Sequence, residues 1–261
     1  MKNLPAFVLI PVIILSVQAC APKEELKMRG AYSMMRQVIN DGSKDSVLDR
    51  KQLKIYTDKH MMYASPNVTD SFANFGVGTY TVQDGKLKET RFYSAEGGEK
   101  TDTFSLNITK NMDGYTQVIE NMVLDSGKYT LTEDYNTVGT DQKSDLDGIW
   151  KQVRNVYITK KGDSSVNSNP LEYKAFESGY FIWAITVTDS LNKKTSVFGY
   201  GHFEMQGNNK SRETVVNSTF RSGLVGKTYE VDIEFTGKDS YRQTITFANG
   251  DRSIEVYERL K

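Results

Sequence analysis

The chain alternates between apolar and polar residues with a period of two from Gly30 onward, and short polar turns interrupt this alternation at close intervals. Such alternation is typical of β-strands that bury one face. In the first half it predicts eight strands, near residues 30–39, 51–56, 60–66, 74–83, 86–94, 101–110, 114–122 and 129–137. The segment from Asp45 to Leu53 is compatible with one helical turn between the first two strands.

A polar stretch separates this half from the next. Residues 139–147 contain only one apolar side chain, Leu146, and are predicted to form a linker. After it the same alternation predicts eight more strands, near residues 148–158, 171–176, 180–189, 195–205, 210–220, 227–236, 240–248 and 252–260.

The two halves share a motif. Residues 75–83 and 198–206 both read F-G-x-G-x-aromatic-x-apolar-Gln, and each is followed by a Gly-containing turn and a Glu-Thr pair. The motif predicts a hairpin in each half, with glycines that mark a bulge or a bend. Three shorter stretches match in the same order: 30–32 with 148–150, 54–56 with 174–176, and 61–63 with 181–183. We therefore predict an internal duplication.

Eight short strands with almost no helix would leave the edges of an open sheet exposed, and closure into a barrel removes those edges. The predicted fold is all-β, with two tandem eight-stranded antiparallel up-and-down β-barrels over residues 29–138 and 148–261. The interior of such a barrel is either filled by side chains or holds one small ligand.

The second half carries a family resemblance. Gly148-x-Trp150, at the start of its first strand, resembles the G-x-W motif of lipocalins, and Arg259 matches the basic residue that packs over that tryptophan. This half is similar to the lipocalin-like domains of Bacteroidetes lipoproteins, and the resemblance implies that Trp150 and Arg259 close the barrel. The first half is similar but has Tyr32 in place of the tryptophan, and the resemblance covers residues 30–261.

Residues 1–19 have the features of a signal peptide: Lys2, an apolar run from Phe7 to Val17 that is too short to span a bilayer, and a small residue, Ala19, before the single cysteine. The sequence around Cys20 resembles a bacterial lipobox, which implies a lipid on Cys20, a tether over residues 20–28, and an outer-membrane lipoprotein of the cell envelope. The alternative is an ordinary signal peptide that leaves Cys20 as a free thiol. A single cysteine provides no internal disulfide.

Charge narrows the choice of partners. The chain has 33 basic and 33 acidic side chains, so removal of the segment that contains Lys2 leaves one net negative charge. Without a basic excess we expect no nucleic-acid partner, and we expect membrane attachment through the lipid and not through a polybasic face.

Catalytic signals are weak. The two histidines, His60 and His202, align with Tyr180 and Thr79 in the other repeat, so we interpret both as structural. The sequence has no nucleophile elbow, no phosphate-binding glycine loop and no zinc-type ligand spacing. We therefore predict a protein without enzymatic activity, cofactor or metal.

Six residues are candidates for ligand binding within the barrels: Tyr63, Tyr80, Glu89, Trp183, Phe203 and Glu213. Glu89 and Glu213 recur at the same place in both repeats. Strand alternation places Glu89 on one face with Leu87, Arg91 and Tyr93, which is either the lumen with a polar anchor or the outer wall, and we favour the wall. Trp183 is expected to line the core together with Phe181 and Ile185.

These observations favour a binding module that holds a small, largely apolar molecule, a lipid or a glycan fragment. The alternative is a structural or interaction subunit of an envelope complex whose barrels are filled. A lumen of about 300 Å³ or more with an open mouth favours the first, whereas a lumen closed by aromatic side chains favours the second.

Overall fold

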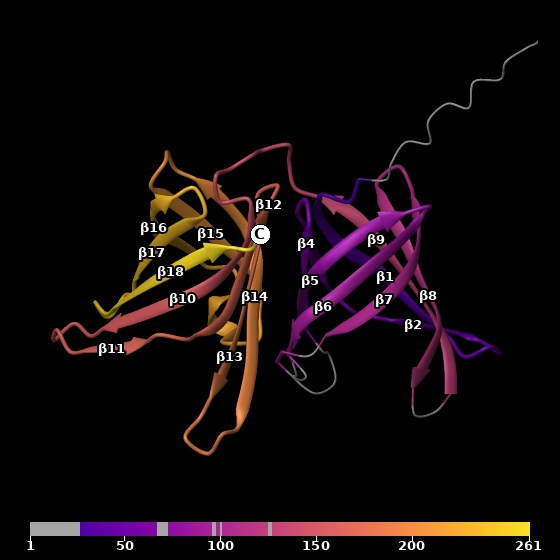
Figure 1. The fold of residues 1–261 in the computed structure, drawn as a ribbon, viewed down its shortest axis with the longest axis horizontal. Helices are drawn as coiled ribbons and strands as arrows, with labels where there is room; N and C mark the ends of the chain where they lie inside the picture. Colours follow the sequence, from indigo (N-terminus) through magenta and orange to yellow (C-terminus); the bar gives the residue numbers. More distant parts are fainter. Residues whose placement is uncertain (1–26, 67–72, 96–97, 100, 125–126) are drawn as a thin grey trace, which may run out of the picture.

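The computed structural model describes residues 27–66, 73–95, 98–99, 101–124 and 127–261, which form two β-barrels side by side (Figure 1). The predicted signal peptide, Cys20 and most of the tether lie outside these residues. Met28, which the sequence assigned to the tether, is only 1% exposed and packs inside the first barrel. The barrel therefore begins before its first strand.

The described part of the chain is almost entirely β-structure, without an α-helix. The first barrel contains β1 (Gly30–Asn40), β2 (Asp45–Leu48), β3 (Leu53–Tyr56), β4 (His60–Pro66), β5 (Ala73–Gln83), β6 (Lys86–Ser94), β7 (Asp102–Lys110), β8 (Gly114–Leu124) and β9 (Gly127–Val138). The second contains β10 (Gly148–Ile158), β11 (Ser164–Asn167), β12 (Leu171–Glu177), β13 (Tyr180–Thr188), β14 (Lys194–Met205), β15 (Lys210–Ser218), a 3-10 turn η1 (Ser222–Leu224), β16 (Thr228–Gly237), β17 (Ser240–Thr246) and β18 (Arg252–Arg259).

Both sheets close. Neighbouring strands pair antiparallel in chain order, and β9 returns to pair with β1 as β18 returns to pair with β10. The short strands β2 and β3 pair with opposite ends of β1 on the same side, so together they fill one of eight strand positions. Strands β11 and β12 do the same against β10. The two eight-stranded antiparallel barrels predicted from the sequence are confirmed.

The helical turn suggested for Asp45 to Leu53 is wrong. Asp45–Leu48 forms β2, because the outer half of β1 from Gln37 to Asn40 has backbone groups that need a partner. Its counterpart β11 was also missing from the predicted strands. Both are four-residue strands with largely exposed side chains, so neither shows a clear alternation.

The first glycine of the repeated motif makes room for an aromatic ring. A Cβ on Gly76 would lie 2.5 Å from the ring of Tyr63, and a Cβ on Gly199 would lie 2.6 Å from the ring of Trp183. Each ring comes from the neighbouring strand and lies across the bare backbone. The glycine is therefore required by a close approach in both barrels.

The second glycine of the motif lies at a β-bulge. The register shifts between Val77 and Gly78, so Phe92 is the extra residue on β6 and Tyr93 turns to the opposite face from Arg91. The prediction that Tyr93 shares a face with Glu89 is therefore wrong. The preference for the outer wall is also wrong, because Glu89 is 5% exposed and makes its contacts inside the barrel.

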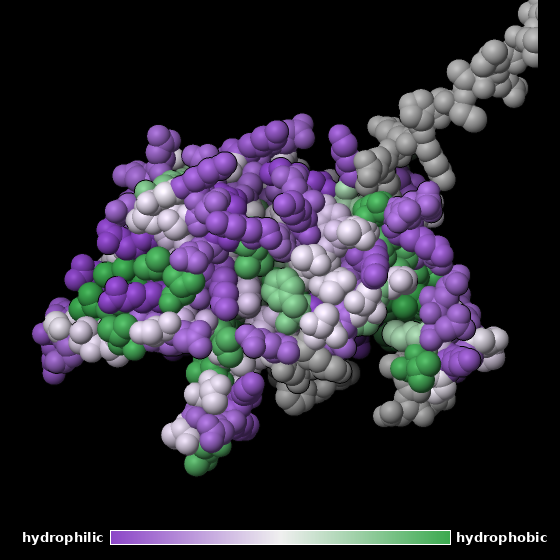
Figure 2. Space-filling model, in the orientation of Figure 1, coloured by the Kyte–Doolittle hydropathy of each residue, from purple (hydrophilic) through white to green (hydrophobic). Residues whose placement is uncertain are grey.

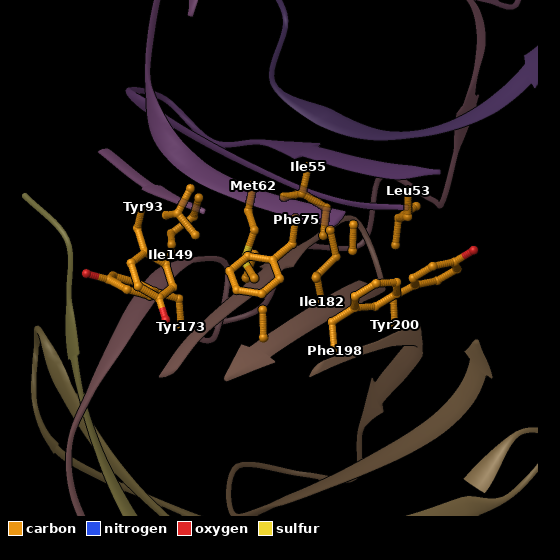
Figure 3. Close-up of a cluster of buried hydrophobic side chains, with 14 of the residues drawn as sticks. Leu53, Ile55, Met62, Phe75, Tyr93, Ile149, Tyr173, Ile182, Phe198 and Tyr200 are labelled. Carbon is orange, nitrogen blue, oxygen red and sulfur yellow. The ribbon is translucent and has the colours of Figure 1, made fainter. Parts of the chain in front are cut away.

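The barrels meet through strands β1 and β3 to β6 of the first and β10 and β12 to β14 of the second (Figure 3). The inter-barrel layer consists of Ala31, Leu53, Ile55, Met62, Ala64, Phe75, Val77, Tyr93, Ile149, Tyr173, Ala175, Ile182, Ala184, Phe198 and Tyr200. Most of these occupy equivalent repeat positions, such as Met62 and Ile182 or Phe75 and Phe198. The layer therefore resembles the isologous interface of a symmetric dimer, within one chain.

Candidate functional site

A buried ion pair crosses the lumen of the first barrel. The ammonium of Lys54 on β3 lies 3.1 Å from Oε1 of Glu89 on β6 and 3.3 Å from Oε1 of Gln117 on β8. The two charged side chains are 3% and 7% exposed. Glu89 is thus the internal polar anchor that the sequence left as an alternative.

A second carboxylate lies beside this pair. Glu133 on β9 accepts hydrogen bonds from Nε2 of Gln37 at 2.6 Å, from the hydroxyl of Tyr135 at 3.0 Å, and from Nε2 of Gln117. Three neutral donors thus replace the water that a buried carboxylate loses. Together these side chains form a polar layer through the middle of the barrel.

The second barrel repeats this layer. Lys174 Nζ lies 2.8 and 3.0 Å from the two carboxylate oxygens of Glu213 and 3.2 Å from Oε1 of Gln243. Glu255 accepts hydrogen bonds from Gln243, Ser253 and Tyr257. The residue pairs that are identical at equivalent positions are Lys54 and Lys174, Glu89 and Glu213, Gln117 and Gln243, Glu133 and Glu255, and Tyr135 and Tyr257.

Sequence reasoning missed both lysines. Their signal was visible, since 54–56 and 174–176 were matched as a repeat and each begins with Lys. A lysine kept on a strand that is otherwise apolar indicates a buried partner of opposite charge.

One of the differences between the two layers lies at Gln52 and its equivalent, Glu172. In the first barrel Gln52 donates its amide to the hydroxyl of Tyr135 at 2.6 Å, whereas in the second Glu172 lies 2.8 Å from the hydroxyl of Tyr257. Burial and the nearby Glu255 raise the pKa of Glu172 to about 8. The hydroxyl of Tyr257 lies 2.8 Å from a carboxylate oxygen of Glu172 and 2.8 Å from one of Glu255, and can donate to either. The amide that donates to Tyr257 in this barrel is that of Gln152, at 3.0 Å, and the raised pKa favours the protonated form of Glu172.

The mouth side of the first barrel contains a hollow of about 180 Å³. It is lined by Gln37, Arg50, Gln52, Lys54, Met61, Tyr63, Ser65, Asn74, Glu89, Arg91, Phe104, Leu106, Gln117, Ile119, Leu131 and Glu133. Oε1 of Gln37 is buried there without a hydrogen-bond partner. At ~30 Å³ per molecule the hollow has room for roughly six waters. Its volume is smaller than the lumen of about 300 Å³ that would favour a binding module.

Aromatic rings pack the opposite, closed end of each barrel. Tyr80 packs at 4.9 Å from Tyr56 and donates its hydroxyl to the carbonyl of Thr57, and Phe203 packs at 4.8 Å from Phe176. Both were candidate ligand-binding residues. The structure places them in the packed ends, away from the hollow.

The other candidates divide between the barrels. Tyr63 lines the hollow with Glu89, and its hydroxyl accepts a hydrogen bond from Arg91 at 2.9 Å. Trp183 lies toward the mouth of the second barrel, where its ring packs 6.2 Å from Phe220, while Glu213 belongs to the polar layer below. The six candidates therefore do not form one site.

Trp150 and Arg259 lie together at the closed end of the second barrel. The guanidinium carbon is 4.0 Å from the indole ring, and the indole nitrogen donates to the carbonyl of Leu146 at 2.7 Å. Arg259 also donates to the carbonyl of Asp145 at 2.9 Å, which holds the end of the linker over the barrel. In the first barrel Tyr32 corresponds to Trp150 and Met28 to Leu146, while Thr137 stands at the position of Arg259.

Neither histidine side chain belongs to the polar layers. His60 is 8% exposed and its pKa is lowered by burial, whereas His202 is exposed and packs against the ring of Tyr180. Among the described residues no three His, Cys, Asp or Glu side chains are grouped so as to hold a metal ion. No helix within the described ranges is long and apolar enough to cross a membrane.

Comparison with known proteins gives the following similarities. Residues 145–261 match a family described as "Domain of unknown function (DUF4488)". No curated protein matches the chain. A lipocalin-like protein from Bacteroides uniformis is 18% identical, with a TM-score of 0.30, over 45% of this chain and 100% of that one. A protein of unknown function from the DUF3598 family of Nostoc punctiforme is 10% identical, with a TM-score of 0.25, over 89% of this chain and 96% of that one.

These likenesses are distant, so strand order and closure carry the assignment of the fold. On that basis the chain consists of two lipocalin-like β-barrels in tandem, and its second barrel is similar to the DUF4488 domain.

Proposed function

We propose that the protein is a non-enzymatic binding protein, and that the hollow in the first barrel holds a compact, uncharged ligand rich in hydroxyl groups, such as the end of a glycan fragment. The observation that carries this proposal is the buried and unpartnered Oε1 of Gln37. An isolated buried acceptor is unfavourable, so a ligand or a water that donates a hydrogen bond there gains free energy.

The charge of the lining supports an uncharged ligand. Arg50, Lys54 and Arg91 face Glu89 and Glu133, and Asp102 pairs with Arg91 at 3.0 Å from outside the hollow. Three cations are thus balanced by three anions. The amides and hydroxyls of the lining match hydroxyl groups of a ligand, whereas an apolar ligand or a lipid chain would desolvate them without replacement.

The rim of the hollow adds an apolar surface. The ring of Phe104 is 37% exposed, and the guanidinium of Arg91 lies 5.3 Å from its centre. Aromatic rings pack well against the C–H faces of sugar rings, so Phe104 and Tyr63 favour a cyclic polyol over a linear one.

The interaction subunit is supported by a different observation. Apolar side chains reach the surface over β10 and β11 and at the tip of the hairpin between β13 and β14 (Figure 2). Val166 is 54% exposed and Leu191 is 86% exposed. In this alternative the second barrel binds a protein partner through β10, β11 and the hairpin between β13 and β14.

A bulky side chain in the hollow tests the proposal. Ile119 lines the hollow, and Ile245 is its equivalent in the second barrel. In native mass spectrometry of the protein from its own host, we expect a small molecule to copurify with the wild type and with Ile245→Trp, and to be lost from Ile119→Trp. Equal retention by all three proteins would place the ligand outside the first lumen, and no bound molecule in any would favour the interaction subunit.

We also propose that Cys20 bears the lipid that the sequence implies. Met28 packs in the closed end of the first barrel, so the chain enters there and the mouths would face away from the membrane. We expect Cys20→Ser to move the protein from the membrane fraction to the soluble fraction, because the apolar anchor is lost. Unchanged fractionation would show that another element holds the protein at the membrane.

A further inference from the structure

The inter-barrel layer has two edges that the repeat relates to each other. At one edge the rings of Phe92 and Tyr173 lie 6.1 Å apart, and Leu171 and Leu260, the equivalents of Lys51 and Val138, pack against the layer. These side chains fill the edge. Figure 3 shows Tyr93 and Tyr173 at this end of the layer, with Leu53 and Tyr200 at the other end.

Two positions of the second edge have smaller side chains than their equivalents at the first, while Tyr200 takes the place of Val77. Leu53 pairs with Ser33 as Tyr173 pairs with Lys151, so Leu53 occupies the position of Tyr173. Val216 is the bulge residue between Val215 and Asn217, which is the position of Phe92. Two aromatic rings of the first edge are therefore missing at the second.

A hollow of about 300 Å³ lies beside Leu53 and Val216. It is lined by Ser33, Met34, Lys51, Leu53, Val138, Tyr180, Tyr200, Gly201, His202 and Val216. Burial raises the pKa of Tyr200 to about 12, so its ring is a neutral wall. This hollow lies outside both lumens, between the barrels, which is a common location for small-molecule sites.

The lining shows which ligand would fit. Most of it is aliphatic or aromatic, its basic groups are Lys51 and His202, both exposed, and it contains no carboxylate. We propose that this hollow binds a small aromatic acid. Its ring takes the place of the missing aromatic side chains, and its carboxylate lies near Lys51. This site is separate from the lumen and does not depend on the proposed function.

The probe for the test is 1-naphthoate, with 1-naphthalenemethanol as an uncharged analogue. We expect NMR titration of the full chain to show one site with a Kd of roughly 0.1 to 1 mM, as suits a ligand of this size. Val216→Phe restores the residue of the filled edge and should weaken binding at least tenfold. Lys51→Gln should weaken naphthoate several-fold and leave the alcohol unchanged.

The controls separate this site from the lumen. Ile119→Trp fills the first lumen and should leave naphthoate binding unchanged, while Leu53→Phe provides a second filling variant if Val216→Phe fails to fold. Thermal unfolding and the NMR spectrum of each variant report its folding. No binding at 1 mM, equal affinity in folded filling variants, or shifts confined to the lumen would each overturn the proposal.

Discussion

Lys174→Met is expected to lower the free energy of unfolding of the second barrel by about 3 to 5 kcal/mol, because it leaves the carboxylate of Glu213 buried without its partner. Lys174 and Glu213 are 3% and 9% exposed and 2.8 Å apart. Both tryptophans of the chain, Trp150 and Trp183, lie in this barrel, so their fluorescence during denaturation with guanidinium chloride reports the change.

The double variant Lys174→Met with Glu213→Met is the matched control. It removes both charges, so it should recover most of the lost stability, since well-packed apolar side chains often replace a buried ion pair at little cost. Lys54→Met should have the same effect on the first barrel, measured by circular dichroism. A loss below about 1 kcal/mol for Lys174→Met would show that water reaches Glu213 and that the layer is not sealed.

Glu172→Gln is expected to remove a pH dependence from the stability of the second barrel. Burial and Glu255 raise the pKa of Glu172 to about 8, above the ordinary value of 4.5. The folded state therefore holds a proton that the unfolded state releases, so the stabilisation is full below about pH 4.5 and is lost as pH rises to about 8. Lys174, Glu213 and Glu255 face the same layer and are unchanged in the variant.

The measurement is the difference in unfolding free energy between Glu172→Gln and the wild type at pH 6, 7.5 and 9. Because Glu172 is partly exposed, we expect the variant to gain about 1 to 2 kcal/mol relative to the wild type over this range. Gln52→Glu should introduce the same dependence in the first barrel. A difference that stays constant with pH would mean that Glu172 is already ionised at pH 6.

Much of the fold could be predicted, because the local alternation of apolar and polar residues locates the strands, and their number favours a closed barrel. Alternation located the long strands, and the motif at residues 75–83 and 198–206 located a hairpin in each half. The exposed edges of an eight-stranded sheet then favour a barrel. The short strands β2 and β11 were missed because their exposed side chains leave almost no pattern.

The faces of the strands were harder to assign. Strand alternation assumes that successive side chains point to opposite faces of the sheet. The bulge at Phe92 adds one residue to β6, so Tyr93 lies in the inter-barrel layer while Arg91 faces the lumen. Glu89 was placed on the wall because Glu89 and Arg91, two residues apart, could both be solvated there. Its partner Lys54 is 35 residues away in the chain, and sequence spacing gives no measure of that distance.

The sequence contains a signal for the contact between the barrels, but a search for strands with only one buried face overlooks it. Residues 181–185 are apolar without interruption, and in the structure Phe181 and Trp183 face the lumen while Ile182 and Ala184 face the other barrel. A continuous apolar run indicates a strand that is buried on both faces. The hollow between the barrels follows from this contact, so alternation alone could not locate it.

The inter-barrel layer also bears on how the two copies came to differ. Because this interface is built from equivalent positions, separate first and second barrels would form homodimers as readily as heterodimers. Heterodimers would then be only a fraction of the assemblies. The short connection between β9 and β10 gives the unlike partner a high effective concentration and so favours the mixed pair. Fusion thereby frees each copy to change independently, which is the condition under which Gln52 and Glu172, or Leu53 and Tyr173, can diverge.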